Sequence, residues 1–356
     1  MGTKPGTKTA LITGVTGQDG ALLARFLLDR GYDVHGLRLY SATDDLQRLP
    51  PDLSTHDRFH LHTGDMTDMA SVMHVMNRVR PDEIYNLAAQ SHVRVSFDVP
   101  ESTAQINALG TLHILESIRL LDLTRNTRMY QASSSEMFGN ALAPQNEETP
   151  FSPCSPYAVS KLAAYWYVRT YRNAYNIFAS NGILFNHESP LRGEEFVTRK
   201  ITRAVAEITA GLKSDPLVLG NLESRRDWGH ARDYVRGMWM MLQADAPDDF
   251  VLATGETHSV REFVEKSFAH VGVVLRWDGE GASERGVCQK TGRALVTIDP
   301  VLYRPSEVHC LLGNAKKARK ILGWEPDIKF DQLVSTMVQA DLELCSWGYA
   351  HDIAAE

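Results

Sequence analysis

A regular alternation of short apolar segments with amphipathic segments, between Thr9 and Phe185, constrains the fold of this chain more than any other feature. The apolar segments that are typical of strands are TALIT, YDVHGLRL, FHLHTGD, EIYNLAA, RMYQASSSE and NIFASNGILFN. Strands that alternate with helices form a mostly parallel sheet with helices on both faces. The pattern therefore predicts an α/β fold with a doubly wound parallel sheet.

The turn after the first strand lies in ITGVTGQDGALLARFLLDRGY, from Ile12 to Tyr32, and has glycines at 14, 17 and 20. Glycine is needed where the backbone turns tightly, where it approaches a pyrophosphate and where a helix packs on a strand. The N–H groups at the start of the following helix can bind phosphates. The turn indicates a dinucleotide site, with an ordinary strand–helix turn as the alternative, because the first two glycines are three apart instead of two.

The pattern becomes irregular after Asn186, where candidate helices cover 197–210, 233–242, 260–271 and 315–322. We interpret this part as a smaller, mixed α/β substrate-binding domain. The expected organisation is a flexible tail at 1–8, a dinucleotide-binding domain at 9–186 to which later segments return, a mostly substrate-binding domain at 187–330, and a C-terminal helix and tail at 331–356. The segment 330–347 is amphipathic and helical in period, and no chemistry is assigned to it.

The charge balance excludes some classes of partner. Thirty-seven Lys and Arg residues against 44 Asp and Glu residues give the 356-residue chain a formal net charge of −7, so no nucleic-acid partner is expected and any phosphate site must be a local basic pocket. No apolar run reaches membrane-spanning length and the start, MGTKPGTK, is polar, so no membrane contact is expected. The four cysteines, Cys154, Cys288, Cys310 and Cys345, lack CxxC spacing, which favours a reducing cytoplasm without a disulfide framework or a zinc site.

Two positions after the early strands bear on the choice of cofactor. The second strand ends at Arg38, where an acidic residue would bind the 2′-hydroxyl of NAD and an arginine would accommodate the 2′-phosphate of NADP. Asp33 lies at the start of that strand, too early for the acidic role, so the sequence favours NADP. In GDMTD, Asp65 could accept a hydrogen bond from the adenine amino group, although taken alone it is interpreted as a turn or helix-capping aspartate.

The segment SPCSPYAVSKLAAYW carries the most informative spacing. Ser155 and Pro156 predict a helix N-cap and a first-turn proline, which places Tyr157 and Lys161 one turn apart on the same face. A lysine ammonium beside a phenol is expected to lower the pKa of the phenol. The phenolate can then take a proton from a substrate hydroxyl as hydride leaves the same carbon.

Just upstream, QASSSEMFG places Ser134 and Glu136 two residues apart on a predicted extended strand end, so that both side chains point to the pocket of the tyrosine. The serine could hydrogen-bond the reacting hydroxyl. Because an unpaired buried carboxylate is costly, Glu136 is interpreted as a functional group and not as a helix cap.

Several motifs together resemble the extended short-chain dehydrogenase/reductase superfamily and, within it, the GDP-mannose 4,6-dehydratase family. They are ITGVTGQDG, EIYNLAAQSHV, YQASSSEMFG, SPYAVSKLAAYW, NGILFNHESP, FVTRKITRAV, GNLESRRDWGHARDYV and YRPSEV, and they extend from Ala10 to about Trp324. The resemblance implies a Rossmann-type domain, bound NADP, a GDP-sugar substrate and a homo-oligomer.

The resemblance also implies a catalytic set made of Ser134, Glu136, Tyr157 and Lys161. Tyr157 would remove the C4 hydroxyl proton while NADP⁺ takes the C4 hydride, and the resulting 4-ketone acidifies C5–H. Glu136 would remove that proton and help water to leave from C6, where the hydride returns. The net redox change is zero, so the cofactor should stay bound and be regenerated within each turnover. GDP-D-mannose would become GDP-4-keto-6-deoxy-D-mannose.

Further binding residues follow from the same motifs, position by position. The implied cofactor contacts are Gly14, Gly17, Gln18, Asp19, Gly20, Arg38, Asp65, Met66, Leu87, Ala88, Ala89, Ser91, Tyr157, Lys161, His187 and Arg192. The implied substrate contacts are Ser91, Ser134, Glu136, Asn186, Val197, Lys200, Leu219, Gly220, Arg226, Arg304 and Glu307. Arginine–phosphate hydrogen bonds would suit the diphosphate, while the alternative for each cation taken alone is ordinary surface ion pairing.

The chain departs from the family pattern at three places. Ser134 stands where threonine is common, which keeps the hydroxyl. The segment RLYSATDDLQRL lacks the usual arginine pair and serine-rich loop, and Leu191 replaces a usual arginine. These loops help neighbouring subunits to share cofactor contacts in tetrameric members, so both a dimer and a tetramer stay open.

Other functions compatible with the motifs are dehydration of another GDP-sugar such as a manno-heptose, nucleotide-sugar decarboxylation or epimerisation, and NADP-dependent regulation without turnover. A 4-epimerase has no need for Glu136, and a regulator has no need for the whole catalytic set. His56, His60 and His62 have a spacing that could bind a metal ion, but solvent-facing histidines are the preferred interpretation, and no metal is predicted.

Overall fold

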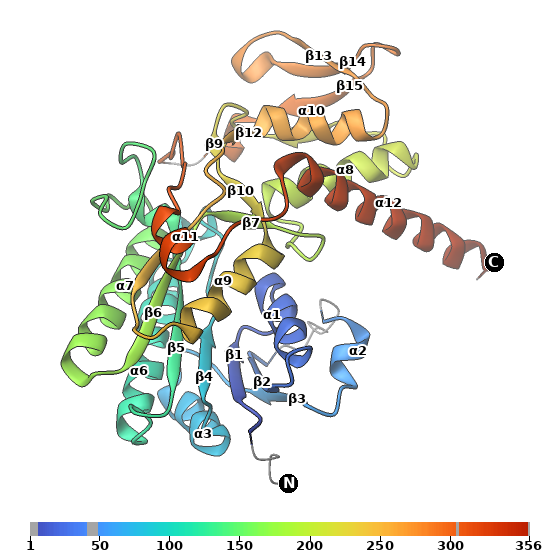
Figure 1. Cartoon of the computed structure of the whole chain (residues 1–356). Coiled ribbons are helices and arrows are strands. Elements are labelled where there is room, and N and C mark those ends of the chain that lie inside the picture. Colours follow the sequence, from blue (N-terminus) through green and yellow to red (C-terminus); the bar gives the residue numbers. More distant parts are fainter. Residues whose placement is uncertain (1–5, 41–48, 304–305, 355–356) are drawn as a thin grey trace.

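The computed structural model describes residues 6–40, 49–303 and 306–354, with side chains as far as residue 346. Within these ranges, seven parallel strands form the central sheet in the order β11-β6-β5-β4-β1-β2-β3 (Figure 1). The strands are β1 (Thr9–Thr13), β2 (Asp33–Arg38), β3 (Phe59–Thr63), β4 (Glu83–Asn86), β5 (Arg128–Ser134), β6 (Phe178–Leu184) and β11 (Asp249–Leu252). The predicted parallel sheet is confirmed, and the sequence pattern missed only its last strand, β11.

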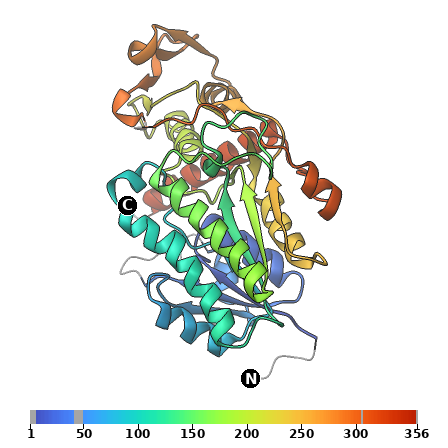
Figure 2. The ribbon, with the colours of Figure 1, turned by 90° about the vertical axis from the view of Figure 1, so that its left-hand side faces the viewer.

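Helices cover both faces of the sheet, as predicted, and Figure 2 shows the face with the long helices α6 and α7. One face carries α1 (Gln18–Leu28), α9 (Ala231–Gln243) and α11 (Lys316–Leu322), and the other carries α3 (Met69–Val79), α6 (Gly110–Leu120) and α7 (Pro156–Tyr175). Successive strand residues point to opposite faces, so Ile12 packs in the first apolar core and Leu11 in the second. Short helical segments in the connections are α2 (Pro51–Ser54), α4 (Val95–Asp98), α5 (Pro100–Ala104), η2 (Gln105–Leu109) and η3 (Ser135–Phe138).

A smaller part lies beyond the carboxyl ends of these strands (Figure 1). In the described ranges, its main sheet has the order β13-β14-β15-β8, formed by β13 (Leu275–Asp278), β14 (Arg285–Cys288), β15 (Ala294–Ile298) and β8 (Leu217–Leu219). Its helices are α8 (Val197–Thr209), α10 (Val260–His270) and α12 (Phe330–Ala354), which share one apolar core with that sheet. Two short pairs, β7 (Asn186–Glu188) with β10 (Trp228–His230) and β9 (Arg225–Arg226) with β12 (His258–Ser259), connect the two parts. Short 3-10 turns are η4 (Gly281–Ser283) and η5 (Pro300–Leu302).

The predicted helices after Asn186 are confirmed within one or two residues at most ends, and the predicted C-terminal helix extends further, to Ala354. Part of the predicted N-terminal tail, residues 1–5, lies outside the described residues. No helix in the described ranges is long and apolar enough to cross a membrane. All four cysteines are unpaired.

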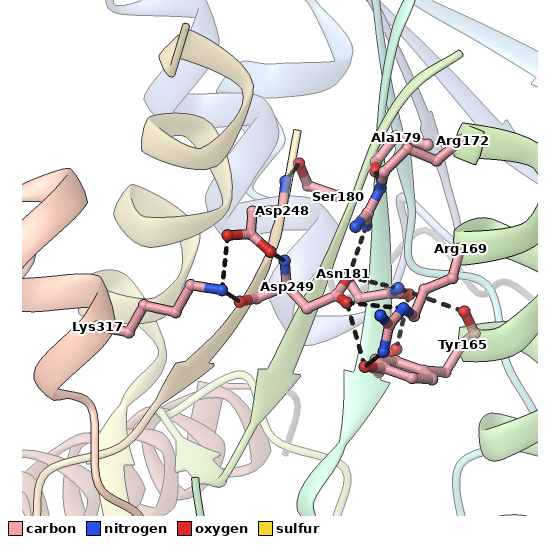
Figure 3. A network of polar contacts seen from close by, with 10 residues as sticks. Tyr165, Arg169, Arg172, Ala179, Ser180, Asn181, Asp248, Asp249 and Lys317 are labelled. Carbon is pink, nitrogen blue, oxygen red and sulfur yellow. Dashed lines mark hydrogen bonds and ion pairs between the residues drawn. The ribbon is translucent and has the colours of Figure 1, made fainter. Parts of the chain in front are cut away.

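A polar network fixes β11 at the edge of the sheet (Figure 3). The buried carboxylate of Asp249, at the start of β11, accepts hydrogen bonds from Asn181 of β6 at 2.9 Å and from Tyr165 of α7 at 3.1 Å, and it pairs with Arg172 of α7. Burial by itself would raise the pKa of Asp249, but the hydrogen bond and charge of Arg172 lower it below its usual range. Lys317 of α11 donates to the Asp249 carbonyl at 2.9 Å. These contacts hold a late segment of the chain against β6 at the edge of the sheet.

Candidate active site

The turn after β1 requires glycine because its backbone packs directly against other backbone atoms. Gly14 adopts φ +68°, and a Cβ on it would lie 2.8 Å from the Ala88 Cα. A Cβ on Gly20, in the first turn of α1, would lie 2.5 Å from the Gly14 carbonyl oxygen. Gly17 is the N-cap of α1 and provides no side-chain cap. The first N–H groups of α1 therefore remain available to a phosphate, as the sequence predicted.

The first turn of α1 is bound to β7 through a buried polar network. Gln18 donates to the His187 carbonyl at 3.1 Å, and Ser189 donates to the Gln18 side chain at 2.9 Å. His187 Nε2 lies 2.7 Å from an Asp19 oxygen, and His187 Nδ1 lies 2.8 Å from the Phe185 carbonyl oxygen. Both ring nitrogens thus face acceptors, which favours the protonated ring.

The charges of this pair follow from the same geometry. Burial would lower the pKa of His187, but the nearby Asp19 carboxylate raises it overall. Burial would raise the pKa of Asp19, and the charge of His187 lowers it overall. The two residues form a half-buried ion pair at the wall of the cavity described below.

The tyrosine–lysine helix begins where the sequence predicted. Ser155 is the N-cap of α7 and its hydroxyl accepts a hydrogen bond from the Ala158 N–H at 3.1 Å, with Pro156 at the first helical position. Tyr157 and Lys161 follow on one face, and both side chains are buried at the cavity. The Tyr157 N–H donates to the Ser96 hydroxyl at 3.1 Å, which anchors the start of this helix to α4.

Glu136 reaches the same cavity by a different backbone path from the one predicted. Strand β5 ends at Ser134, and the chain continues in the 3-10 turn η3 instead of an extended segment. The Ser134 hydroxyl caps this turn by accepting a hydrogen bond from the Glu136 N–H at 3.2 Å. The prediction of an extended strand end was wrong for this reason, although both side chains line the cavity.

The expected lowering of the phenol pKa by Lys161 is not found in this structure. Burial raises the pKa of Tyr157 to about 12, and a hydrogen bond with Ser134 is the largest opposing contribution. Lys161 Nζ lies 5.9 Å from the centre of the Tyr157 ring and donates to the Ala132 carbonyl at 2.9 Å. Burial also lowers the pKa of Lys161 to about 8. The ammonium is therefore directed to the end of β5, and Ser134 is the nearer partner of the phenol.

A cavity of about 600 Å³ lies between the carboxyl ends of the central strands and the smaller part of the chain. It brings together most of the residues that the sequence proposed for the site. They are Asp19, Leu87, Ala89, Ser91, Ser134, Glu136, Tyr157, Lys161, Asn186, His187, Arg192, Val197, Lys200, Leu219, Gly220, Arg226 and Glu307.

Other proposed residues lie away from this cavity or outside the described ranges. Gly14, Gly17, Gln18, Gly20, Arg38, Asp65, Met66 and Ala88 do not line it. Asp65 accepts hydrogen bonds from the N–H and hydroxyl of Thr67, both at 2.8 Å, so the interpretation as a turn aspartate is confirmed. The Met66 side chain is buried in the core against α3 and α6. Arg304 and most of the segment RLYSATDDLQRL lie outside the described residues.

Basic side chains line the cavity, which matches the predicted local basic pocket. Within the described part of the chain, the Lys200 ammonium has no hydrogen-bond or ion-pair partner, and burial lowers its pKa. Arg192 lies over the Phe196 ring at 3.6 Å, and its Nε is 3.2 Å from a Glu188 oxygen. The buried Arg226 donates to the Val308 carbonyl at 2.9 Å. The cavity can therefore attract an anionic ligand.

Sequence analysis missed several residues of this cavity. Arg94 lines it from the start of α4 and pairs with Asp98 at 2.9 Å. Thr198 of α8 also lines it and donates to Glu188 at 2.6 Å. Arg94 directly follows the motif EIYNLAAQSHV, and Thr198 lies inside the motif FVTRKITRAV. The only sequence signal for Arg94 was its spacing of one helical turn from Asp98, which is typical of an ion pair on one face of a helix.

A family model described as GDP-mannose 4,6 dehydratase matches residues 11–337. The chain belongs to this family. It is 57% identical over 340 residues to the GDP-mannose 4,6-dehydratase of Sinorhizobium fredii, with 94% of this chain and 97% of that protein covered. It is 52% identical over 341 residues to the human GDP-mannose 4,6 dehydratase, with 94% and 91% covered.

Solved structures confirm the fold of the family. The dTDP-glucose 4,6-dehydratase of Bacillus anthracis, solved in complex with NAD, superposes with a TM-score of 0.78 at 20% identity. The superposition covers 96% of this chain and 98% of that chain. The Rossmann-type fold predicted from the glycine turn and the strand–helix alternation is thereby confirmed.

Proposed function

We propose that this protein is a hydro-lyase that converts GDP-D-mannose to GDP-4-keto-6-deoxy-D-mannose with NADP bound throughout turnover. The observation that carries the proposal is the meeting of Glu136 with Tyr157, Ser134 and Lys161 in one cavity. A simple dehydrogenase needs the tyrosine and lysine but has no use for a second acid–base group. The level of identity to GDP-mannose 4,6-dehydratases over nearly the whole chain supports the same reaction.

The residues around the glycine turn fit a dinucleotide. Gly14 and Gly20 keep the strand and helix close together, and the uncapped start of α1 offers N–H groups for the pyrophosphate. Leu87 and Ala89 line the cavity next to this turn. When bound there, the nicotinamide supplies the acceptor and donor of the hydride that moves from C4 to C6 of the sugar.

Tyr157 acts on the C4 hydroxyl in this proposal. Its phenolate accepts the hydroxyl proton, and the Ser134 hydroxyl stabilises the phenolate by a hydrogen bond. Lys161 donates to the Ala132 carbonyl near the end of β5 and lines the same cavity as Tyr157. The O4–H bond breaks and its proton goes to Tyr157, while the hydrogen of the C4–H bond would leave as hydride to the nicotinamide, so that the C4 carbonyl forms.

Glu136 acts on the next two bonds. The C4 ketone acidifies the neighbouring C5–H, and the Glu136 carboxylate takes this proton. The resulting carboxylic acid then donates the proton to the C6 hydroxyl, which leaves as water while a C5–C6 double bond forms. Hydride would then return from the nicotinamide to C6, and C5 would receive a proton that balances the one Tyr157 took from the C4 hydroxyl, so the reaction has no net redox change.

Cations that line the same cavity would hold the diphosphate of the substrate. Lys200 and Arg226 line the cavity, and Lys200 has no acceptor among the described residues. Burial reduces solvation of the ammonium, so an anion is a favourable partner for it. Asn186, Val197, Leu219, Gly220 and Glu307 line the same region and are proposed substrate contacts.

The test of the proposed function is mass spectrometry of purified protein incubated with GDP-mannose, and with other nucleotide sugars in parallel, without added cofactor. Loss of one water from GDP-mannose is the expected result, and it would also show that the cofactor is retained. Loss of water only from another GDP-sugar, such as a manno-heptose, would keep the mechanism and change the substrate. No reaction with any sugar, even after NADP is added, would contradict the proposal and favour a regulatory role.

The Ser134 hydrogen bond predicts a change in pH dependence. The C4 oxidation rate should rise with pH because the phenolate fraction of Tyr157 rises towards its pKa of about 12. Ser134→Ala removes a hydrogen bond that lowers this pKa, so the rise should move to higher pH. In single-turnover measurements from pH 7 to pH 10, below the phenol pKa, the variant should therefore be slower than wild type at every pH, and equal rates would contradict the role given to Ser134.

Arg38 stands at the end of β2, where the sequence placed it, and is proposed to bind the 2′-phosphate of NADP. Arg38→Ala should lower the affinity for NADP by about tenfold or more and change the affinity for NAD little, because the 2′-phosphate loses one charged hydrogen-bond partner. Titration of protein stripped of cofactor measures both affinities. Arg125→Ala, an exposed arginine in the turn before β5, is the matched control. If Arg38→Ala keeps the preference for NADP over NAD, another group, in this chain or in a neighbouring subunit, binds the 2′-phosphate.

The homo-oligomer, dimer or tetramer, and the cytoplasmic location remain predictions within this proposal. Light scattering of the purified holoenzyme would determine the number of subunits.

A further inference from the structure

The edge of the central sheet carries a group of polar side chains that the proposed reaction does not use. Strands β2 and β3 are parallel neighbours at this edge, and their register pairs His35 with His60 (Figure 1). Residues two apart on a strand share a face, so Asp33 lies with His35, and His62 lies with His60. Val34 points the other way, into the core with α1. Four potential metal ligands therefore project from one face of two adjacent strands.

The atoms of three of these side chains already lie close together. His60 Nε2 is 2.9 Å from one Asp33 oxygen, and His35 Nε2 is 3.7 Å from the other. One ligand atom from each of the three residues lies within 4.8 Å of the others. Ligand atoms around a tetrahedral zinc ion, at Zn–N distances of about 2.0 Å, are separated by roughly 3.3 Å. Small side-chain rotations would bring the three atoms to this separation.

His62 lies behind His35 as an orienting residue. His35 Nδ1 is 2.8 Å from His62 Nε2, and the two rings stack at 5.1 Å between centroids. When His35 Nδ1 is the donor of this hydrogen bond, its Nε2 carries the lone pair on the side of Asp33. Metal-binding histidines commonly donate their second ring nitrogen in this way. The arrangement thus presents His35 in the tautomer that a metal requires.

Solvent can reach the group, because the side chains of Asp33, His35 and His60 are 15%, 17% and 43% exposed. On the facing helix α3, His74 and Arg78 add positive charge near His62, which opposes a cation. The Asp33 carboxylate offsets part of this charge at the ligand atoms themselves. Asp33, His35 and His60 do not line the catalytic cavity.

We propose that Asp33, His35 and His60 bind one Zn²⁺ ion at the outer edge of the sheet, with water as the fourth ligand. Two imidazoles and one carboxylate suit zinc better than magnesium or calcium, which prefer oxygen ligands. The ion would join β2 to β3 directly. Strand β2 ends at Arg38, three residues beyond His35, so the ion would also stiffen the strand that carries the proposed NADP contact. His56, which the sequence placed beside His60 and His62, has no part in this group because its Nδ1 accepts from the Arg58 N–H.

The experiment is calorimetric titration of Zn²⁺ into the holoenzyme after treatment with a chelator and removal of the chelator. Wild type should bind one Zn²⁺ per chain. Its unfolding temperature should rise with zinc concentration, because zinc binds the folded chain. His60→Gln and Asp33→Asn should each lower the zinc affinity by more than about tenfold, and His62→Gln should lower it by about tenfold. His56→Gln should bind zinc as wild type does.

Two results would overturn the proposal: wild type without a one-to-one zinc site, or His60→Gln and Asp33→Asn variants with wild-type affinity. His60 is partly exposed, so its substitution should leave the fold intact, and circular dichroism without metal verifies this. Titration with Mg²⁺ should give no binding at this site. Binding of Mg²⁺ that equals zinc and is lost in the same variants would contradict the choice of metal.

Discussion

Glu136→Gln should lower the rate of water loss by about 10²- to 10⁴-fold, because the amide can neither take the C5 proton nor deliver it to the C6 hydroxyl. The side chain is 8% exposed at the cavity, and glutamine has nearly the same shape, so the fold should be retained. Removal of the C4 hydride should continue in this variant. We therefore expect reduced cofactor to accumulate after GDP-mannose is added, without the dehydrated product.

Absorbance of the reduced nicotinamide and mass spectrometry of the sugar measure these two effects separately. Glu148→Gln, an exposed glutamate in the loop after η3, is the matched control and should keep wild-type activity. Full dehydratase activity in Glu136→Gln would refute the role given to this residue. Equal loss of cofactor reduction and water loss would assign Glu136 to substrate binding instead.

Tyr157→Phe should block the reaction one step earlier, with a fall of about 10²- to 10⁴-fold in C4 oxidation. The variant lacks the phenolate that takes the C4 hydroxyl proton, so neither reduced cofactor nor dehydrated product should form. The same two measurements thus distinguish this variant from Glu136→Gln. Tyr157 is buried at the start of α7, and phenylalanine keeps its ring packing.

Tyr167→Phe is the control for Tyr157→Phe because it changes a tyrosine of the same helix outside the cavity. It should leave both measurements at wild-type levels. Rapid cofactor reduction in Tyr157→Phe would contradict the proposed base. In that case Lys161, whose pKa is lowered to about 8 by burial, would be the next base to test.

Local patterns in the sequence were sufficient to predict structure where residues close together in the chain determine it. Ser155 and Pro156 begin α7 because a hydroxyl and a fixed φ angle act within one turn of the chain. The same helix then brings Tyr157 and Lys161 to one face by its period alone. The glycines of the first turn were also recognised, although their structural reason, contact with Ala88 and Val15, became visible only in the fold.

Local patterns did not predict structure correctly where the residues that determine it lie far apart in the chain. Strand β11 is four residues long and has no strong pattern, and it is fixed by residues of α7, β6 and α11. The path of Glu136 depends on capping by the Ser134 hydroxyl, which ended the strand earlier than expected. The pKa of Tyr157 is raised by burial, which a spacing of four residues between tyrosine and lysine does not reveal.

The sequence by itself determined the doubly wound sheet, the dinucleotide turn, the tyrosine–lysine helix and the family resemblance, because each depends on periodicity or on short motifs. Tertiary structure alone decided that Lys200 and Arg226 line one cavity with Glu136, and that His35 lies beside His60 at the sheet edge. Those neighbours come from separate elements, and only the packing of helices on the sheet and the register between strands bring them together.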